Sequence, residues 1–250
     1  MEDEASGSFD CSCNRRSFLR FASISPLMGV LGGSLLTANV LAKTLTSAKR
    51  DPMTPEEIIE MMKAGNERFR LGNNHAHNYL TEQREVSAHG QYPAAIILSC
   101  MDSRAPAETI MDLGIGDIFN TRIAGNVTNP DIIGSMEYAC KVAGSKVILV
   151  MGHTQCGAIK GAIDKVELGH LTNLLSKIEP AVFSTEYSGE RSSKNYEFVN
   201  AVARTHVAMT VEEIKRGSPI LDDLNKKGSI KIIGSLYDIN SGILSFLTPK

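Results

Sequence analysis

One stretch decides both the fold and the expected site: Ala94-Ala95-Ile96-Ile97-Leu98-Ser99, followed by Cys100-Met101-Asp102-Ser103-Arg104. Its first six residues form a short, mostly apolar run, which predicts a buried parallel strand. A second such run, Lys146-Val147-Ile148-Leu149-Val150-Met151, precedes His153-Thr154-Gln155-Cys156. Both polar motifs therefore follow the carboxyl end of a strand. In an open α/β sheet, this edge is where ligand sites form.

Two thiols and an imidazole at adjacent strand ends suit a tetrahedral zinc ion. Cys100, His153 and Cys156 would supply three ligands to one ion per chain and leave the fourth position to water or Asp102. A closed structural site would need another good ligand, and Cys140, the remaining cysteine outside the leader, falls inside a predicted helix. The residues alone leave open that each cysteine is a small buried hydrophobe and the spacing a coincidence.

The rest of the chain predicts alternating helices and strands. Thr54, Pro55 and Glu57 indicate the start of an amphipathic helix, with Thr54 as its N-cap. Further expected elements are a strand over Ile118–Arg122, a crossover helix over Asp131–Ala143, a long helix from Val199 to Ile214, and a hairpin of Ile230–Tyr237 with Ile243–Leu247. The fold class is therefore α/β, with a mostly parallel central sheet, an antiparallel edge strand and flanking helices.

Histidines outside the zinc motif are expected to be structural. The polar segment from Leu71 to Gln91 predicts a solvated loop, and its irregularly spaced His75, His77 and His89 are not expected to be ligands. His206 lies on the apolar stripe of the long helix. A histidine in such a position is usually a hydrogen-bonded core or interface residue.

Composition excludes some classes of function. A net charge of −2 provides no basic field for nucleic acid. Tryptophan is absent and aromatic residues make up 6% of the chain, which argues against stacking platforms for bases. Of five cysteines, two lie in the leader and two in the zinc motif, so no disulfide framework is expected.

Residues 1–42 are expected to be an export leader outside the fold. Arg15 and Arg16 precede a weakly apolar, uncharged stretch from Phe21 to Ala42, which resembles a twin-arginine signal. Val40-Leu41-Ala42 offers a cleavage site, although the stretch is long enough to be a retained membrane anchor. Residues 43–53 would then be a polar linker before a zinc domain over 54–250. We expect a periplasmic protein, exported folded after thiolates have bound zinc in a reducing compartment.

The combined motifs resemble those of the β-class carbonic anhydrases, especially the bacterial members. The resemblance covers about Thr54 to Leu247. It rests on both zinc motifs and on Gly65-Asn66-Glu67-Arg68-Phe69, Ala124-Gly125-Asn126 and Gly134-Ser135-Met136-Glu137-Tyr138. It implies zinc-dependent reversible hydration of carbon dioxide to bicarbonate and a proton. It also implies a homodimer or homotetramer in which the N-terminal helix lies across a partner subunit; packing on its own core is the alternative.

Asp102 and Arg104 are the expected catalytic residues. Asp102 is placed to accept a hydrogen bond from zinc-bound water, and Arg104 to grip Asp102 bidentately and keep it off the metal. Released from Arg104, Asp102 could become the fourth zinc ligand and close the site. Backbone groups of four residues could contact a bicarbonate-sized anion: Gly157 and Ala158, which open a helix, and the small Gly125 and Asn126.

Two other functions use the same motifs. One is hydrolysis of carbon disulfide or carbonyl sulfide, which differs from carbon dioxide hydration mainly in pocket access. The other is a non-catalytic, zinc-stabilised binding protein. Asp102 and Arg104 argue against the second, because a structural zinc site does not need them.

Overall fold

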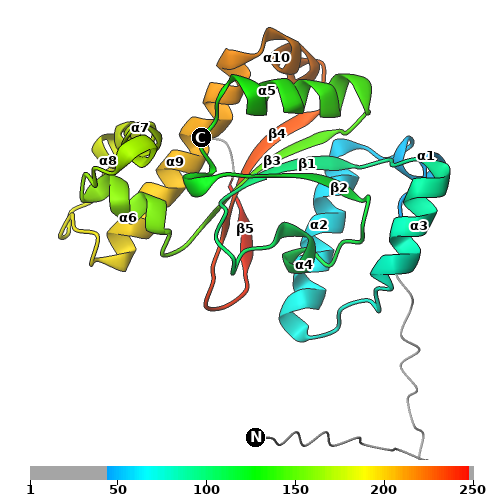
Figure 1. The fold of residues 1–250 in the computed structure, drawn as a ribbon, viewed down its shortest axis with the longest axis horizontal. Helices are drawn as coiled ribbons and strands as arrows, with labels where there is room; N and C mark the ends of the chain where they lie inside the picture. The colour runs from blue at the N-terminus through cyan, green and yellow to red at the C-terminus, as the bar shows by residue number, and fades with distance from the viewer. Residues whose placement is uncertain (1–43, 248–250) are drawn as a thin grey trace, which may run out of the picture. The chain divides into compact units, whose positions relative to one another are not determined.

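The computed structural model describes residues 44–247, so the expected leader lies outside the described part of the chain. Five strands form one sheet in the order β2-β1-β3-β4-β5 (Figure 1). Four are parallel: β1 (Ala95–Ser99), β2 (Ile118–Arg122), β3 (Val147–His153) and β4 (Lys231–Tyr237). The short β5 (Leu244–Phe246) pairs antiparallel with β4, which confirms the predicted fold class and closing hairpin.

The two central strands are the apolar runs that precede the zinc motifs. Every residue of β1 and β3 is buried, as expected for parallel strands covered on both faces. They pair directly, with Ala95 opposite Val147 and Ser99 opposite Met151. This register ends both strands at the same edge of the sheet.

Alternate residues of these strands serve two helical layers. Ala95, Ile97, Val147 and Leu149 pack with α2 (Pro55–Leu71) and α4 (Ala107–Ile110) on one face. The intervening side chains pack on the other face with α5 (Pro130–Glu137), α9 (Tyr196–Gly217) and α10 (Pro219–Lys226) (Figure 1). The period-two alternation of a strand produces this division.

A third cluster lies where the strands end. The ligand candidates Cys100 and Cys156 pack there with Phe198 and Val202 of α9 and with three short helices. These three helices are α6 (Gly157–Ile163), α7 (Gly169–Ser176) and α8 (Glu179–Ser184). The remaining elements are α1 (Ser47–Arg50), α3 (Tyr79–His89), η1 (Ala124–Asn126) and η2 (Tyr138–Val142).

Helix α2 begins where the sequence predicts. Thr54 Oγ1 accepts from Glu57 N at 3.2 Å, and Glu57 Oε2 accepts from Thr54 N at 2.7 Å, a complete capping box. Ile58 and Met62 are fully buried in the chain's own core. The buried face of the helix is therefore accounted for within one subunit.

The structure corrects the predicted loop between Leu71 and Gln91. Residues Tyr79–His89 form α3, and two of the three histidines are tied into the protein. His77 Nδ1 lies 2.9 Å from Glu82 Oε1, and His75 Nδ1 lies 2.9 Å from Asp112 Oδ2. Both carboxylates are buried: Glu82 lies in α3 itself, and Asp112 lies far away in sequence. Their contacts with the histidines explain why a polar segment is ordered.

Two other segments differ in detail from the predictions. The crossover helix ends as a turn of π-helix, η2, after Glu137. The expected linker contains α1, and Arg50 of this helix is buried and donates to Ala143 O at 2.8 Å. The segment thus packs on the core of the domain.

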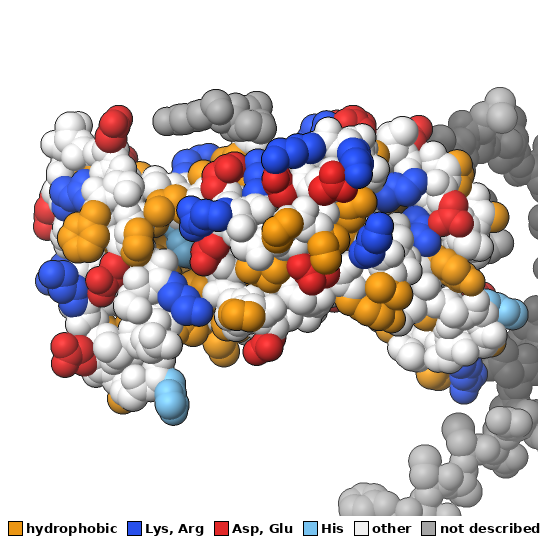
Figure 2. Space-filling view, turned by 90° about the horizontal axis from the view of Figure 1, so that it is seen from above, with side chains coloured by type: hydrophobic (Ala, Val, Ile, Leu, Met, Phe, Trp, Pro, Cys, Tyr) orange, Lys and Arg blue, Asp and Glu red, His pale blue; other side chains and the backbone are white. Residues whose placement is uncertain are grey.

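The described surface carries mixed charge. Basic and acidic side chains are interspersed on the face shown in Figure 2, in keeping with a net charge of −2. Between residues 44 and 247, no helix combines the length and apolar character that crossing a membrane requires.

Candidate metal centre

The aligned strand ends bring the three predicted ligands together. Cys100 follows β1, His153 ends β3, and Cys156 is the N-cap of α6. Their ligand atoms all lie within 4.8 Å of one another, and the two sulfur atoms are 3.9 Å apart. The residues are 5%, 2% and 2% exposed, respectively. Two zinc–sulfur bonds of ~2.3 Å at a tetrahedral angle would set the sulfurs ~3.8 Å apart, so the spacing fits zinc.

The turn between His153 and Cys156 is held in place from outside. Gln155 has φ 57°, a left-handed conformation that costs a non-glycine residue about 1 kcal/mol or more. Its N–H donates to Asn200 Oδ1 of α9 at 2.9 Å. Thr154 N donates to Tyr237 O of β4 at 2.9 Å. These partners lie far away in sequence, so the motif alone could not show them.

His153 presents one ring nitrogen to the site. Its Nδ1 lies 2.9 Å from Thr154 O, and a carbonyl only accepts, so Nδ1 carries the hydrogen. Nε2 is buried and has no hydrogen-bond partner among the described residues. A lone pair on a buried, unpartnered nitrogen suits a metal ligand whose other nitrogen is fixed by a hydrogen bond.

The two thiols require a cation if both are to be ionised. Their mutual hydrogen bond lowers the pKa of Cys100 and raises the pKa of Cys156, since one proton shared between two sulfurs favours a single thiolate. Gly125 N–H donates to Cys100 Sγ at 3.4 Å, and the N–H groups of Ala158 and Ile159 favour the thiolate of Cys156. A divalent cation would supply the remaining charge. The donor set therefore fits zinc.

Asp102 and Arg104 form the pair that the sequence predicts. Arg104 Nε donates to Asp102 Oδ1 at 3.0 Å and Nη2 to Oδ2 at 2.8 Å. These bonds hold the pKa of Asp102 well below its usual range. Asp102 Oδ2 lies 3.7 Å from His153 Nε2, but Asp102 does not belong to the three-ligand group. The carboxylate thus sits beside the metal position while Arg104 grips it.

Arg122 is a site residue that sequence analysis missed. Its Nε donates to Cys100 O at 3.1 Å, and its Nη2 donates to Asp102 O. Arg122 therefore fixes the turn that carries both the first ligand and the acidic residue. The sequence shows it only as the end of a strand, because its partners are brought near by the pairing of β1 with β2.

Two of the four expected anion contacts lie against the sulfurs. Gly125 and Ala158 direct N–H groups at Cys100 and Cys156, respectively, and Gly157 opens α6. Asn126 has φ 44° and a buried Nδ2 without a partner in the described part of the chain. Contact of these groups with a bound anion stays a prediction.

The other thiol and histidines lie outside this group. Burial raises the pKa of Cys140 to about 12, so it is an unreactive core thiol. Within residues 44–247, His75, His77 and His206 do not join a metal-binding group.

The sequence is similar to those of known carbonic anhydrases. A family model described as carbonic anhydrase matches residues 95–244. Carbonic anhydrase 2 of Mycobacterium tuberculosis is 32% identical over 193 residues, covering 75% of this chain and 90% of that protein. The carbonic anhydrase of Mycolicibacterium smegmatis is 31% identical over 193 residues, covering 75% and 91%.

The fold points to one class of these enzymes. The β-carbonic anhydrase CafA of Aspergillus fumigatus superposes with a TM-score of 0.58 at 27% identity, covering 67% of this chain and 82% of that chain. The family model spans more than half of the sequence. The two zinc motifs of this chain lie within the matched residues and meet in one buried group. On the evidence of sequence, fold and site together, this chain belongs to the β-class carbonic anhydrase family.

Proposed function

We propose that this protein catalyses the zinc-dependent, reversible hydration of carbon dioxide to bicarbonate and a proton. The observation that carries the proposal is the buried Cys100–His153–Cys156 group with an arginine-held carboxylate beside it. A zinc site that only stabilised the fold would need neither Asp102 nor Arg104. Three protein ligands also leave a fourth position for chemistry, as catalytic zinc sites do.

Each residue of the site has a distinct task. Zinc, when bound, lowers the pKa of a coordinated water to about 7 and so provides hydroxide near neutral pH. Asp102 stays ionised because Arg104 donates to both of its oxygens, and Oδ2 can accept a hydrogen bond that orients the nucleophile. The same two donors hold the carboxylate beside the ligand group, with Oδ2 3.7 Å from His153 Nε2, without making it one of the three ligands. Burial of the three ligands keeps bulk water from competing for them.

Stopped-flow measurement of carbon dioxide hydration tests the proposal. The zinc-loaded protein should hydrate carbon dioxide, a chelator should abolish the activity, and added zinc should restore it. A zinc-loaded protein no faster than the uncatalysed reaction would refute the proposal. If that same sample hydrolysed carbonyl sulfide or carbon disulfide, the alternative substrate class would replace it.

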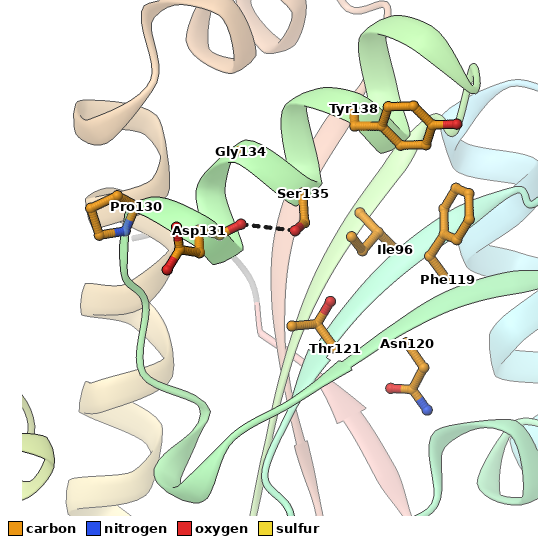
Figure 3. A pocket seen from close by; sticks show the side chains of 9 residues that line it. All are labelled: Ile96, Phe119, Asn120, Thr121, Pro130, Asp131, Gly134, Ser135 and Tyr138. Carbon is orange, nitrogen blue, oxygen red and sulfur yellow. Dashed lines mark hydrogen bonds between the residues drawn. The ribbon is translucent and has the colours of Figure 1, made fainter. Parts of the chain in front are cut away.

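We also propose that subunits associate as dimers or multiples of dimers. Strand β2 forms an edge of the sheet, and a groove of about 540 Å³ runs beside it (Figure 3). Phe119 and Tyr138 line the groove with ring centroids 6.4 Å apart, and Tyr138 is 56% exposed. An open strand edge beside the exposed Tyr138 and the partly buried Phe119 favours burial by a second copy. Related β-carbonic anhydrases of Sordaria macrospora are described as tetrameric.

Sedimentation of the wild type and Tyr138→Glu tests the association. The wild type should sediment as a dimer or larger, and a charge in the groove should weaken its assembly. Tyr92→Glu is the control, because Tyr92 does not line the groove. An active, zinc-loaded monomer at micromolar concentration would contradict the proposal.

Export to the periplasm by the twin-arginine route is a further part of the proposed function. Its support is the paired Arg15 and Arg16 before an uncharged stretch, and the free thiols of Cys100, Cys140 and Cys156, which fit folding in a reducing compartment. Replacing both arginines with lysine should leave the precursor in the cytoplasm, whereas Arg20→Lys should not. Cell fractionation that finds the double variant exported normally would reject this route.

A further inference from the structure

A buried histidine lies behind the metal centre and has no part in the proposed mechanism. His206 of α9 is 4% exposed, and its Nε2 lies 2.8 Å from Gly125 O. Because a carbonyl oxygen only accepts, Nε2 must carry the hydrogen. Burial lowers the pKa of His206, which favours this neutral, single-donor form of the ring.

Gly125 connects this histidine to a zinc ligand. While its carbonyl accepts from His206, its N–H donates to Cys100 Sγ at 3.4 Å. Gly125 has φ +66°, and a Cβ there would lie 2.6 Å from Ile178 Cδ1, so only glycine fits without a shift. Glycine is also the residue whose backbone rotates most freely. Something must therefore hold its N–H on the sulfur, and the described structure offers the bond to His206.

A donated hydrogen bond matters to a thiolate ligand. It stabilises the negative charge and fixes the direction of the sulfur, and loss of such outer contacts weakens metal binding. Helix α9 gives the other ligand segment a similar support, because Asn200 Oδ1 accepts from Gln155 N at 2.9 Å. Two polar side chains of one helix thus hold the backbone beside both cysteine ligands.

We infer that His206 is a positioning residue of the metal centre, which holds the Gly125 N–H against the Cys100 sulfur by donating to the Gly125 carbonyl. It is not one of the three ligand residues. The inference rests on zinc being held by Cys100, His153 and Cys156, as proposed above.

The test measures zinc affinity of the full chain by competition with a chromophoric chelator. His206→Met removes the donor at similar volume, while His206→Gln keeps an N–H at a similar reach. Val211→Ala is the matched control, since Val211 is buried in the same helix but packs in a cluster that contains none of the ligands. Cobalt-substituted protein gives a second readout in its thiolate-to-cobalt absorption bands.

His206→Met should weaken zinc binding about 10-fold or more and shift the cobalt bands, as loss of outer contacts commonly does. His206→Gln and Val211→Ala should stay close to the wild type. Wild-type affinity and bands in His206→Met would overturn the inference, as would equal losses in His206→Met and Val211→Ala or no rescue by His206→Gln.

Two further comparisons keep the result decisive. If His206→Met does not fold, His206→Asn replaces it, because its amide is one methylene too short to reach Gly125. Equal affinities of the Gln and Asn variants would then overturn the inference. Cys100→Ala separates the two claims: zinc affinity unchanged by Cys100→Ala would overturn the zinc site itself and the role of His206 with it.

Discussion

At the scale of residues, the Asp102–Arg104 pair can be separated from the zinc ligands by mutation. Arg104→Ala and Asp102→Ala should each retain zinc, because the three ligands remain, but lose orientation of the nucleophile. We expect hydration to fall ~100- to 10,000-fold in either variant, the usual effect of removing a group that directs proton transfer. Because the two residues act as one unit, the double variant should be little worse than the poorer single one.

Stopped-flow rates and zinc analysis of the same samples check this prediction. Arg70→Ala is a suitable control, because Arg70 makes an exposed ion pair with Glu67 on α2. Both single variants working at wild-type rates between about pH 6 and pH 9 would show that the pair has no catalytic role.

His206 should make stability depend on pH in a defined direction. Burial lowers its pKa in the folded protein below the ordinary value of 6.5, while the hydrogen bond to Gly125 and the charge of Glu213 on the same helix oppose this effect. As pH falls, the unfolded chain therefore binds the proton first, and folding loses stability below about pH 6.5. Above that pH both states are neutral at this residue and its contribution is constant.

Denaturant unfolding of zinc-loaded wild type and His206→Gln isolates this contribution. Protonation of the zinc ligands affects both proteins alike, so only the difference in unfolding free energy matters. On acidification from about pH 7.5 to 5.5, this difference should move in favour of His206→Gln, which has no group that titrates there. If the unfolding free energies of the two proteins changed by the same amount over this pH range, the lowered pKa of His206 would be contradicted.

At the scale of elements, the contact of α2 with the segment after α4 rests on a glycine. A Cβ at Gly65 would lie 1.8 Å from Met111 O, a backbone atom, so α2 would have to move. We expect Gly65→Ala to lower the unfolding free energy by about 1–3 kcal/mol through overpacking. Helix propensity alone predicts the opposite sign, a gain of about 0.5–1 kcal/mol.

Its neighbour Ala64 provides the control. Ala64 is exposed on the same helix, so Ala64→Gly should cost only the propensity difference of about 0.5–1 kcal/mol. Urea unfolding of both variants decides the matter. If Gly65→Ala were stabilising, the described close packing of α2 would be wrong.

Sequence patterns predicted those elements whose causes are local. The capping box at Thr54 is set by four consecutive residues. The buried strands β1 and β3 can be recognised in the sequence as apolar runs. The meeting of the zinc motifs follows from two parallel strands ending at one edge. Helix α3 was missed because the segment looks polar throughout, whereas its Glu82 is buried and accepts a hydrogen bond from Ile115 N, which only the folded chain brings near. Arg122 and Asn200 were missed for the same reason.

At the scale of the molecule, zinc should couple the loops of the site to the stability of the whole domain. Two buried thiols share one proton without a cation, so binding should contribute directly to folding. Removal of zinc should lower the thermal midpoint, and its return should restore it. Cys140→Ala should keep this response, because Cys140 lies outside the site, whereas Cys156→Ala should lose it. An identical response in the two variants would contradict the coupling.

X-ray absorption at the zinc edge shows directly whether Cys100, Cys156 and His153 hold the metal. The zinc-loaded protein should show two sulfur neighbours at about 2.3 Å and nitrogen or oxygen neighbours at about 2.0–2.1 Å. A zinc shell with no sulfur, or with more than two sulfur neighbours, would exclude this ligand set.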